Sequence, residues 1–559
     1  MRTYTRASLV KDTLAGLVLT ALLVPAGMAY AEAAGLPVIC GLYATIVSLL
    51  VYAIFGPNRI LVLGPDSALA ALIAATILPL ASGNVDHTVV LAGMLAILSG
   101  SLCILAGFAK LGFVTELLSK PIRYGYINGI ALTVLIGQLP IMLGFSVRGQ
   151  DVPLRATGLL HGILQGRTDW SAFVISSLCL IVIFGCKRWA PRVPGVLIAV
   201  IGATIAVSLL DLAAPGGVSV VGPLPQGLPA IRLPVVSITE LRTLFPGAVA
   251  LALVSFADMS VLSRTFAQRG GYEVDANQEL VALGMANVAT GLCQGFSVSS
   301  SASRTPVAES AGAKTQVTGV VGACCVGLLL VFAPTLLKNL PHPALGAVVV
   351  SACLGFMEVS GVLRLYRLRR SELAFSIACF LGVTLLGVVE GIFIAIALAL
   401  LAFVWRAWRP YDAVLGRVDG LKGYHDISRH PDARLIPGLV LFRWDAPLFF
   451  ANAAIFQEHV LRAVANAPTT TKWVVVAAEP VTDIDITSAD MLAELDQKLH
   501  QFDMDLCFAE MKGPVKDRLK RYELFTSLGT ENFFSTIGQA VDQYLAKYDV
   551  NWSDWEDQS

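Results

Sequence analysis

Long apolar segments recur along the first three quarters of this chain and constrain its fold more than any other feature. Runs of roughly 17 to 23 apolar residues fit helices that cross a hydrocarbon core of about 30 Å, and shorter runs fit half-helices or segments at the membrane surface. We count about fourteen, at 13–34, 38–55, 66–82, 88–109, 122–143, 171–187, 194–213, 245–264, 276–293, 303–311, 317–336, 343–360, 372–388 and 390–408. With 55% hydrophobic and 14% charged residues, the sequence predicts an α-helical polytopic membrane protein embedded in a lipid bilayer.

The distribution of basic residues predicts the orientation. Short cytoplasmic loops carry an excess of Lys and Arg. If the N-terminus is cytoplasmic, the basic clusters at 110–123, 187–192 and 364–370 fall on the inner side, while the short outer loops at 82–87 and 388–391 carry almost no basic residues. An even number of spans also returns the C-terminus to the inner side. We therefore expect both termini in the cytoplasm.

Two extended polar runs interrupt the apolar pattern. One covers 295–306 (GFSVSSSASRTP) and the other 60–67 (ILVLGPDS), and they lead into the tenth and the third apolar segments. Irregular polar backbone is tolerated at membrane depth only where protein or a watery cavity surrounds it, and paired broken segments in two halves of a chain point to a transport site. Seven segments per half is an odd number, so we predict a 7+7 inverted repeat in which the two runs meet at the centre.

The two runs supply the candidate binding residues. The half-helices that follow them would aim their N-termini, each with roughly half a positive charge, at one central point, which favours an anion. We expect the positive charge of Arg304 to hold the anion; the alternative is a structural salt bridge to Asp258 or Asp66. The position of Asp66 favours a helix cap over a ligand. The candidate residues are Ser301, Ala302, Ser303, Arg304, Gly64, Pro65, Asp66, Ser67 and, near the bend at Pro25 of the first segment, Tyr30.

Asp258 is the candidate for binding a coupling ion. It is the only carboxylate in the apolar run 245–262, and an ionisable residue inside a membrane segment is costly and usually functional. We expect it to be either the counter-charge of Arg304 or the site of a proton or a sodium ion. Glu32, near the outer end of the first segment, is expected at the membrane interface, with a coupling role as the alternative.

The composition changes after the last apolar segment. Residues beyond 410 are rich in charge and alternate between strand-like and helix-like patterns, which predicts a small cytosolic α/β domain. Strands are expected at 438–443, 472–478 and 505–509, and helices at 452–464, 488–502, 515–524 and 536–547. We place a transmembrane domain at 1–410, a linker at 411–425 and the α/β domain at 426–559.

Other features argue against other classes of protein. Equal numbers of basic and acidic residues, 40 of each, disfavour nucleic acid as a partner, because phosphate binding needs a basic excess. The seven histidines are scattered, and the ten cysteines lie mostly in apolar stretches without a CxxC pair, so we expect no metal site and no cofactor. The sequence contains no nucleophile elbow and no Walker motif, and we do not expect an enzyme.

Several motifs resemble those of one family. They are 24–31 (VPAGMAYA), 35–37 (GLP) and 41–43 (GLY) in the first two segments, Gly64 and Pro65 before the third, and Ser303 and Arg304 with 312–316 (GAKTQ) around the tenth. Together they resemble the sulfate permease (SulP) family, bacterial relatives of solute carrier family 26. The stretch 437–452 (PGLVLFRWDAPLFFAN) is similar to the opening strands of the STAS domain that such transporters carry. The resemblance implies a homodimer in the bacterial inner membrane, core and gate domains that move against each other, and transport of inorganic anions or small carboxylates.

The resemblance also bears on regulation and coupling. In anti-sigma antagonist relatives a phosphorylatable Ser or Thr occupies the place of Thr487, which makes Thr487 a regulatory candidate. In sodium-coupled bicarbonate relatives an Asp at the position of Asp258 is joined by a Thr one helical turn later, where this chain has Leu262. Leu262 offers no oxygen to a cation, although Ser263 could rotate in. We therefore favour a proton over sodium at Asp258, because a proton needs only one carboxylate whose pKa burial can raise.

The predicted function is secondary active transport of a small anion of the sulfate, bicarbonate or dicarboxylate class, coupled to protons, by alternating access of the core against the gate. Two alternatives stay open: a sodium-coupled bicarbonate symporter, and a membrane-anchored STAS regulator or sensor. A mere anchor would not need two broken segments. The sequence does not choose among the anions, because the same dipoles, hydroxyls and single arginine would meet all of them.

Overall fold

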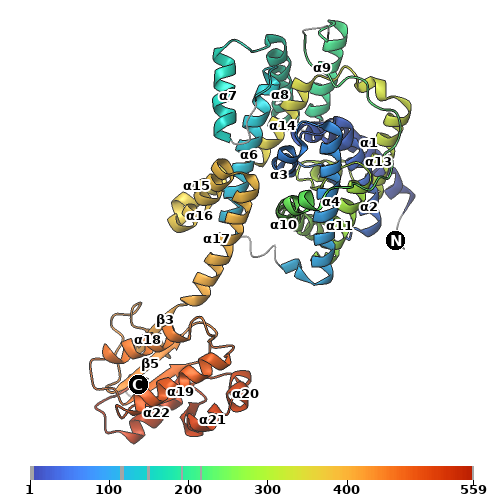
Figure 1. The fold of residues 1–559 in the computed structure, drawn as a ribbon. Helices are drawn as coiled ribbons and strands as arrows, with labels where there is room; N and C mark the ends of the chain where they lie inside the picture. Colours follow the sequence, from blue (N-terminus) through green and yellow to red (C-terminus); the bar gives the residue numbers. More distant parts are fainter. Residues whose placement is uncertain (1–4, 114–118, 148–151, 191–192, 214–216, 557–559) are drawn as a thin grey trace. The chain divides into compact units, whose positions relative to one another are not determined.

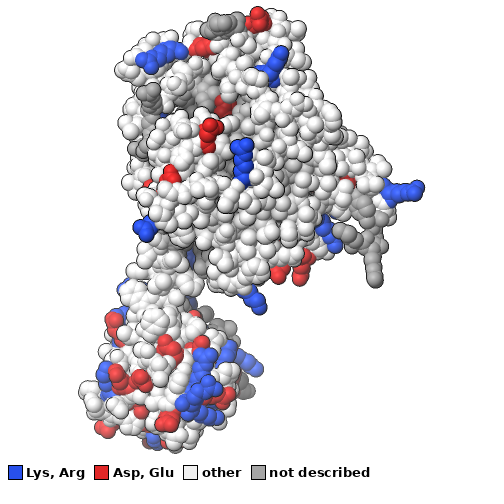
Figure 2. All heavy atoms as spheres, turned by 45° about the vertical axis from the view of Figure 1, so that its right-hand side comes forward, with Lys and Arg blue, Asp and Glu red and all other residues white. Residues whose placement is uncertain are grey.

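The computed structural model describes residues 5–113, 119–147, 152–190, 193–213 and 217–556. The chain forms two compact units, Met1–Ala399 and Leu400–Ser559, which we call the membrane unit and the C-terminal unit (Figure 1). Charged side chains divide in the same way. Figure 2 shows few Lys, Arg, Asp and Glu on the visible face of the membrane unit and many on the C-terminal unit. This is the partition expected when one part of a chain lies in lipid and the other in water.

Each apolar segment expected from the sequence coincides with a helix. Among the described residues, eight helical stretches are long and apolar enough to cross a membrane, and α3, α9 and α13 are shorter apolar helices. The helices are α1 (Arg6–Ala33), α2 (Val38–Phe55), α3 (Ser67–Ala81), α4 (Val85–Phe108), α6 (Lys120–Met142), α8 (Trp170–Trp189), α9 (Gly195–Leu209), α10 (Ile238–Arg269), α11 (Ala276–Leu292), α12 (Arg304–Ser310), α13 (Val317–Phe332), α14 (His342–Phe356), α16 (Arg370–Leu381) and α17 (Val388–Trp408).

Two further helices, α7 (Val152–Leu164) and α15 (Val359–Leu368), were not expected. They have 13 and 10 residues and carry basic side chains, so no long apolar run marks them. The segment expected at 372–388 is divided between α16 and a π-helical turn, η3 (Gly382–Leu386).

The packing of the helices follows the predicted inverted repeat. α1 packs against α12 and α13, and its counterpart seven spans later, α10, packs against α3 and α4. Likewise, α2 packs against α13 and α11 against α4, while α8 packs against α14 and α16 against α6. Each of these equivalent contacts joins one half of the chain to the other. The packing separates a core group, α1–α4 with α10–α13, from a gate group, α6, α8, α9, α14, α16 and α17.

Two glycines allow α1 and α2 to cross at close range. A β-carbon added at Gly41 would lie only 1.9 Å from the carbonyl oxygen of Gly27. Small residues permit such approaches between helices in lipid, where close packing drives association. Gly27 lies one turn before Tyr30, so this contact fixes the part of α1 that faces the centre of the membrane unit.

The C-terminal unit is a six-stranded sheet in the order β4-β3-β5-β6-β7-β8 with helices on both faces (Figure 1). The strands β5 to β8 are parallel, and β3 is antiparallel to both β4 and β5. One face packs against α18 and α19 and the other against α22. The strands are β3 (Asp412–Arg417), β4 (Tyr424–Asp426), β5 (Leu439–Trp444), β6 (Trp473–Ala477), β7 (Asp505–Ala509) and β8 (Phe533–Phe534), and the helices are α18 (Ala453–Ala465), α19 (Ile486–His500), α20 (Gly513–Arg521), α21 (Leu524–Ser527) and α22 (Ile537–Lys547).

The predicted linker at 411–425 is wrong, because β3 and most of β4 lie inside it. β3 pairs with β5, and this pairing buries Ala413 and Leu415. The segment looks like a linker in sequence because its strands are short and separated by glycines and charged residues. Its apolar side chains can be recognised as the buried face of a strand only when β5 is placed beside them.

The C-terminal residues fasten onto the β3–β4 hairpin through Arg417, which is 4% exposed. Its Nε pairs with Asp554 at 2.8 Å and its Nη2 with Glu556 at 3.2 Å. Its Nη1 donates to the carbonyl of Gly423 at 2.9 Å. Every guanidinium nitrogen of this buried arginine therefore has a partner.

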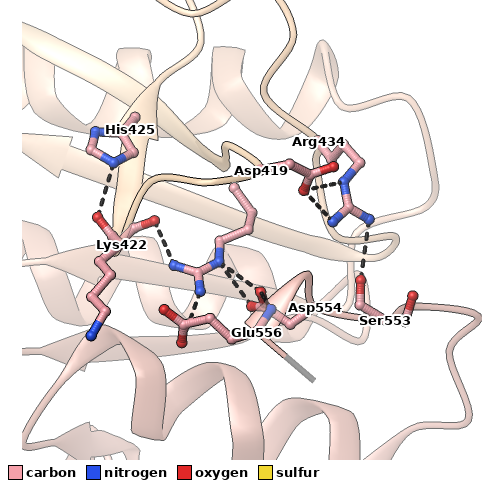
Figure 3. Close-up of polar contacts among 9 residues, drawn as sticks. Asp419, Lys422, His425, Arg434, Ser553, Asp554 and Glu556 are labelled. Carbon is pink, nitrogen blue, oxygen red and sulfur yellow. Dashed lines mark hydrogen bonds and ion pairs between the residues drawn. The ribbon is translucent and has the colours of Figure 1, made fainter. Parts of the chain in front are cut away.

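A second arginine holds the same tail. Arg434 pairs with Asp419 at 2.6 Å and donates to the backbone carbonyl of Ser553 at 3.2 Å (Figure 3). Its guanidinium also lies 4.7 Å from the ring centroid of Trp552. Residues 552–556 are thus an integral part of the sheet edge.

Candidate functional site

The two extended runs predicted from the sequence meet inside the membrane unit. β1 (Leu63–Gly64) pairs with β2 (Ser299–Ser300) as a short antiparallel ladder. α3 then begins at Ser67 and α12 at Arg304. The structure therefore brings the candidate residues of the two halves to one place, as the inverted repeat predicted.

Arg304 crosses from the second half of the chain to the first. Its side chain is 2% exposed, and its Nη2 donates to the carbonyl of Pro65. Its Nη1 lies over Gly64, where an added β-carbon would approach it to 2.8 Å. Nε and Nη1 are buried without a hydrogen-bond partner. An unpaired buried donor costs about 1–3 kcal/mol, so this arrangement favours a ligand that supplies acceptors.

The salt bridges considered as alternatives for Arg304 are not formed. No ion pair joins Arg304 to Asp66 or Asp258, all three of which lie in described parts of the chain. Asp66 instead caps α3, because its Oδ1 accepts from the backbone N–H of Ala68 at 3.0 Å. This cap was the interpretation that the sequence favoured. Its carboxylate offsets part of the positive end of α3, so the positive charge at the centre comes mainly from Arg304.

The serine run combines buried and accessible positions. Ser301 is buried and accepts from the backbone N–H of Arg304 at 3.2 Å, and its hydroxyl lies 3.2 Å from that of Ser303. Ala302 and Ser303 are exposed although their neighbours on both sides are buried. Buried Tyr30, on α1, lies near Arg304 and the α3 cap. The predicted residues therefore gather at the end of the β1–β2 ladder, where Ala302 and Ser303 are accessible.

Asp258 lies on α10, a helix that packs against β2. It is half-buried, and no hydrogen bond or ion pair joins it to another described residue. The charged neighbours that act on it are Asp66 and Arg123. Ser299 of β2 donates to the carbonyl of Ser255, one turn before Asp258 on the same helix, at 2.9 Å. The ladder and the candidate coupling residue are thereby tied together.

Two residues near Asp258 were missed by the sequence analysis. Arg123 was assigned to an inner loop, but it lies within α6, and its Nε is buried without a partner. Tyr126, one turn later, is also buried with an unpaired hydroxyl. Their three-residue spacing on one helix was visible, but nothing in the sequence placed α6 opposite α10.

Ser263, considered as a further oxygen ligand beside Asp258, is engaged elsewhere. Its hydroxyl donates to the carboxylate of Glu279 on α11, and its oxygen accepts from the side-chain amide of Asn58 at 3.0 Å. Glu279 is buried and also accepts from Tyr52 at 2.8 Å. This network links α2, α10 and α11 within the core group, and no pattern in the sequence predicted it.

Thr487 is exposed near the N-terminus of α19. Asp485 caps that helix by accepting from the N–H of Ser488 at 2.8 Å, and Ser488 itself is buried. Arg518 of α20 pairs with Asp483 in the loop before the helix. The hydroxyl of Thr487 is therefore accessible, and its regulatory role stays a prediction.

Models of two known protein families match this chain. A model of the sulfate permease family matches residues 9–379, which is more than half of the chain, and a model of the STAS domain matches residues 430–540. The chain belongs to the sulfate permease family. The family resemblance inferred from the motifs is thus confirmed, and the fully paired arginines described above lie in and around its STAS domain.

Similar sequences carry names of transporters. The probable sulfate transporter Rv1739c of Mycobacterium tuberculosis is 41% identical over 543 residues, which cover 97% of this chain and 96% of the relative. The chloroplastic sulfate transporter 4.1 of Arabidopsis thaliana is 29% identical over 574 residues, covering 98% and 82%. This member of the sulfate permease family is therefore a multi-pass membrane protein of a family of anion transporters, and it is not an enzyme.

Solved structures share the fold. The murine solute carrier 26 family member A9 anion transporter in the inward-facing state aligns with a TM-score of 0.89 at 22% identity, covering 98% of this chain and 93% of that chain. The transmembrane domain of the cyanobacterial bicarbonate transporter BicA aligns with a TM-score of 0.61 at 21% identity, covering 71% and 98%. The predicted architecture, a helical transmembrane domain followed by a STAS domain, is confirmed.

Proposed function

We propose that this protein carries a small inorganic oxyanion across the membrane by secondary active transport, with sulfate as the first substrate to test. The observation that supports this most directly is Arg304, a buried cation with two unpaired nitrogen donors beside the exposed Ala302 and Ser303. Hydrogen bonds to charged groups contribute about 1.5–3 kcal/mol each. The names of the sulfate-transporting relatives favour sulfate over other oxyanions.

The anion would receive donors from both halves of the repeat. Arg304 supplies the charge, and the hydroxyls of Ser303 and Tyr30 supply neutral donors. Backbone N–H groups at 66–67 and 302–303 lie at the starts of α3 and α12. Because the carboxylate of Asp66 repels an anion at the start of α3, we place the anion on the Arg304 side of the site.

We propose that Asp258 carries a coupling proton. Its carboxylate is free of protein partners, and Asp66 of the same site is one of its charged neighbours. A sodium ion would need several oxygen ligands, but Leu262 has none and the hydroxyl of Ser263 is held by Glu279. A single carboxylate is enough to bind a proton. This arrangement favours proton coupling over the sodium-coupled bicarbonate alternative.

Transport would proceed by movement of the core group against the gate group. Asp258 and Arg304 belong to core helices, whereas the charged neighbour of Asp258, Arg123, belongs to gate helix α6. Movement of the core would change the distance between these charges and so link protonation to the position of the core. We further propose a homodimer in the bacterial inner membrane with cytoplasmic termini, supported by the family resemblance and by the basic inner loops.

The test uses the full-length protein reconstituted in liposomes. We expect uptake of labelled sulfate to respond to an imposed pH gradient, to lose that response in Asp258→Asn, and to be unaffected when potassium replaces sodium. Asp211→Asn, which changes an exposed carboxylate, is the matched control. Strict dependence on sodium at constant pH would contradict proton coupling, and the absence of sulfate flux with flux of another labelled anion would replace the substrate.

A further inference from the structure

A carboxylate and an imidazole meet at the outer end of the membrane unit in the orientation proposed above. Glu32 lies in the last turn of α1, and His342 is the first residue of α14. The Oε1 of Glu32 lies 2.6 Å from the Nδ1 of His342, and the side chains are 15% and 28% exposed. α1 belongs to the core group and α14 to the gate group, so this pair joins the two groups.

The two partners are held differently. The backbone N–H of His342 donates to the carbonyl of Ser219 at 3.0 Å, and the preceding Pro341 forms a β-bridge with Val220. The backbone of His342 is therefore held at the start of gate helix α14. Glu32 lines a cavity of about 480 Å³ between α1, α3, α6 and η3, and its Oε2 is buried without a partner. A carboxylate oxygen in this state is stabilised by a proton or by a neighbouring positive charge.

We propose that Glu32 and His342 form an outer protonation site that joins the core to the gate and opens when the core moves. This inference rests on the proposed alternating access, and it adds a second titrating site to Asp258. With a protonated ring, the pair has both a charge attraction and a hydrogen bond; with a neutral ring, only the hydrogen bond remains. Histidine is the side chain that changes charge in the physiological pH range. Protonation of His342 from the outer side therefore strengthens its contact with Glu32. Loss of that proton weakens the contact and frees the core group to move.

Few other charged side chains lie around the Glu32–His342 pair and could titrate in its place. Arg155 of α7 and Glu390 of α17 line the same cavity. Among elements packed against α1 or α14, Asp169 caps α8, Asp211 follows α9, and Lys338 lies in the loop before His342. The loop that holds the backbone of His342, 218–222, carries no titratable side chain. The tests below leave all of these groups unchanged.

The molecule contains a matched control. His87 of α4 pairs with Glu240 of α10, with 2.8 Å between Nε2 and Oε1 and with similar exposure, 33% and 23%. This pair has the same chemistry and lies at the same end of the membrane unit, but both of its helices belong to the core group. It should not break when the core moves against the gate.

The first experiment measures uptake of labelled sulfate into liposomes against external pH, with the full-length protein. We expect His342→Gln to flatten the profile between about pH 5.5 and 8, the range in which histidine titrates, while uptake at its best pH stays within about fivefold of wild type. Glu32→Gln should flatten it as well. His87→Gln should keep the wild-type profile. If the His342 variant keeps the wild-type profile, the inference is wrong; if wild type shows no sulfate uptake, the proposed substrate fails instead.

The second experiment tests whether the pair crosses a moving boundary. Glu32→Cys with His342→Cys should form a disulfide under mild oxidation, lose at least about tenfold of its uptake, and recover on reduction. His87→Cys with Glu240→Cys should cross-link without loss, and wild type under the same oxidant accounts for the ten native cysteines. Normal uptake by the linked 32–342 protein would overturn the inference. Where the paired variant is inactive before oxidation, the pH profile of His342→Gln decides.

Discussion

Two buried arginines, one in each unit, behave in opposite ways. Arg417 at the sheet edge of the C-terminal unit is 4% exposed, and each of its guanidinium nitrogens has a partner. Arg304 at the centre of the membrane unit is 2% exposed, yet Nε and Nη1 have none. The two side chains are almost equally buried, and they differ in how many of their guanidinium nitrogens form hydrogen bonds. A paired buried arginine holds a fold together, whereas one with unpaired donors is ready to hold a ligand.

The difference between the two arginines also corresponds to a difference in the roles of the two units. The tail that closes over Arg417 brings two carboxylates, so that charge is neutralised within the chain. Neither of the carboxylates considered as a counter-charge pairs with Arg304: Asp66 caps α3, and Asp258 on α10 forms no ion pair. If Arg304 binds the transported anion as proposed, a permanent counter-charge would occupy that site. The following experiments test this contrast.

The largest effect is expected for Arg304→Ala. Loss of the charge and of two available donors should lower sulfate uptake at least about 100-fold, because each such hydrogen bond contributes about 1.5–3 kcal/mol. The variant should reach the membrane and unfold at a temperature close to that of wild type. Liposome flux and thermal unfolding of the purified protein measure the two properties. Arg269→Ala, which removes a 60% exposed arginine from the same unit, is the control, and normal flux in Arg304→Ala would end the contrast.

Gly64→Ala should disturb Arg304 without removing it. The new β-carbon would lie 2.8 Å from Nη1, so the guanidinium must shift. We expect uptake to fall about tenfold, equivalent to about 1.4 kcal/mol, mainly through weaker apparent affinity for the anion. Gly202→Ala on α9 is the matched control, since nothing lies within 4 Å of its added β-carbon. Equal uptake by the two variants would mean that the position of the guanidinium is unimportant.

Arg417→Ala should affect stability and spare transport. It leaves the partly buried Asp554 without its partner, so we expect the hairpin and tail to lose about 2 kcal/mol of local stability, less than for a fully buried pair. Hydrogen exchange of 412–426 and 550–556 in the full-length protein would show it, while sulfate uptake should change less than about twofold. Arg462→Ala breaks an exposed pair with Glu458 and should change exchange hardly at all. A large loss of uptake in Arg417→Ala would show that the two arginines are not functionally separate.

The smallest effect concerns Asp426 on the same hairpin. Burial alone would raise its pKa, but hydrogen bonds from Tyr411 and Ser428 outweigh burial and hold the pKa of this carboxyl below its ordinary value. A lowered folded-state pKa stabilises the hairpin above the unfolded pKa of about 3.9, and this stabilisation is lost as pH falls through the folded pKa. The protection of β3 and β4 amides against hydrogen exchange, corrected for the intrinsic exchange rate at each pH, should therefore fall below about pH 4. Asp426→Asn should remove that dependence; an unchanged acid response in it would assign the effect to other carboxylates.

Most of the membrane architecture was predictable because its signals are local. A helix that crosses lipid must be apolar over its own length, so the segments at 38–55 and 276–293 could be placed to within a residue of α2 and α11. α7 and α15 were missed because they are short and carry charge. The strands in 411–425 were missed because β3 is stabilised by pairing with β5 and not by a pattern within its own segment. An element was predictable where its stabilising contacts depend on its own segment, and it was missed where they depend on other segments.

For the candidate site, the chain order alone indicated which runs would meet, since an inverted repeat places its third and tenth segments at one centre, and the family motifs could be recognised residue by residue. The hydrogen-bond partners could not be read in this way. Ser263 turning to Glu279, Arg123 facing Asp258, and the pairing of Glu32 with His342 across 310 positions of sequence are contacts between helices whose mutual rotation depends on the packing of the whole unit. Hydrophobic length is a property of a segment, but whether a buried nitrogen is paired or free depends on every element packed around it, and that choice was made by the tertiary structure.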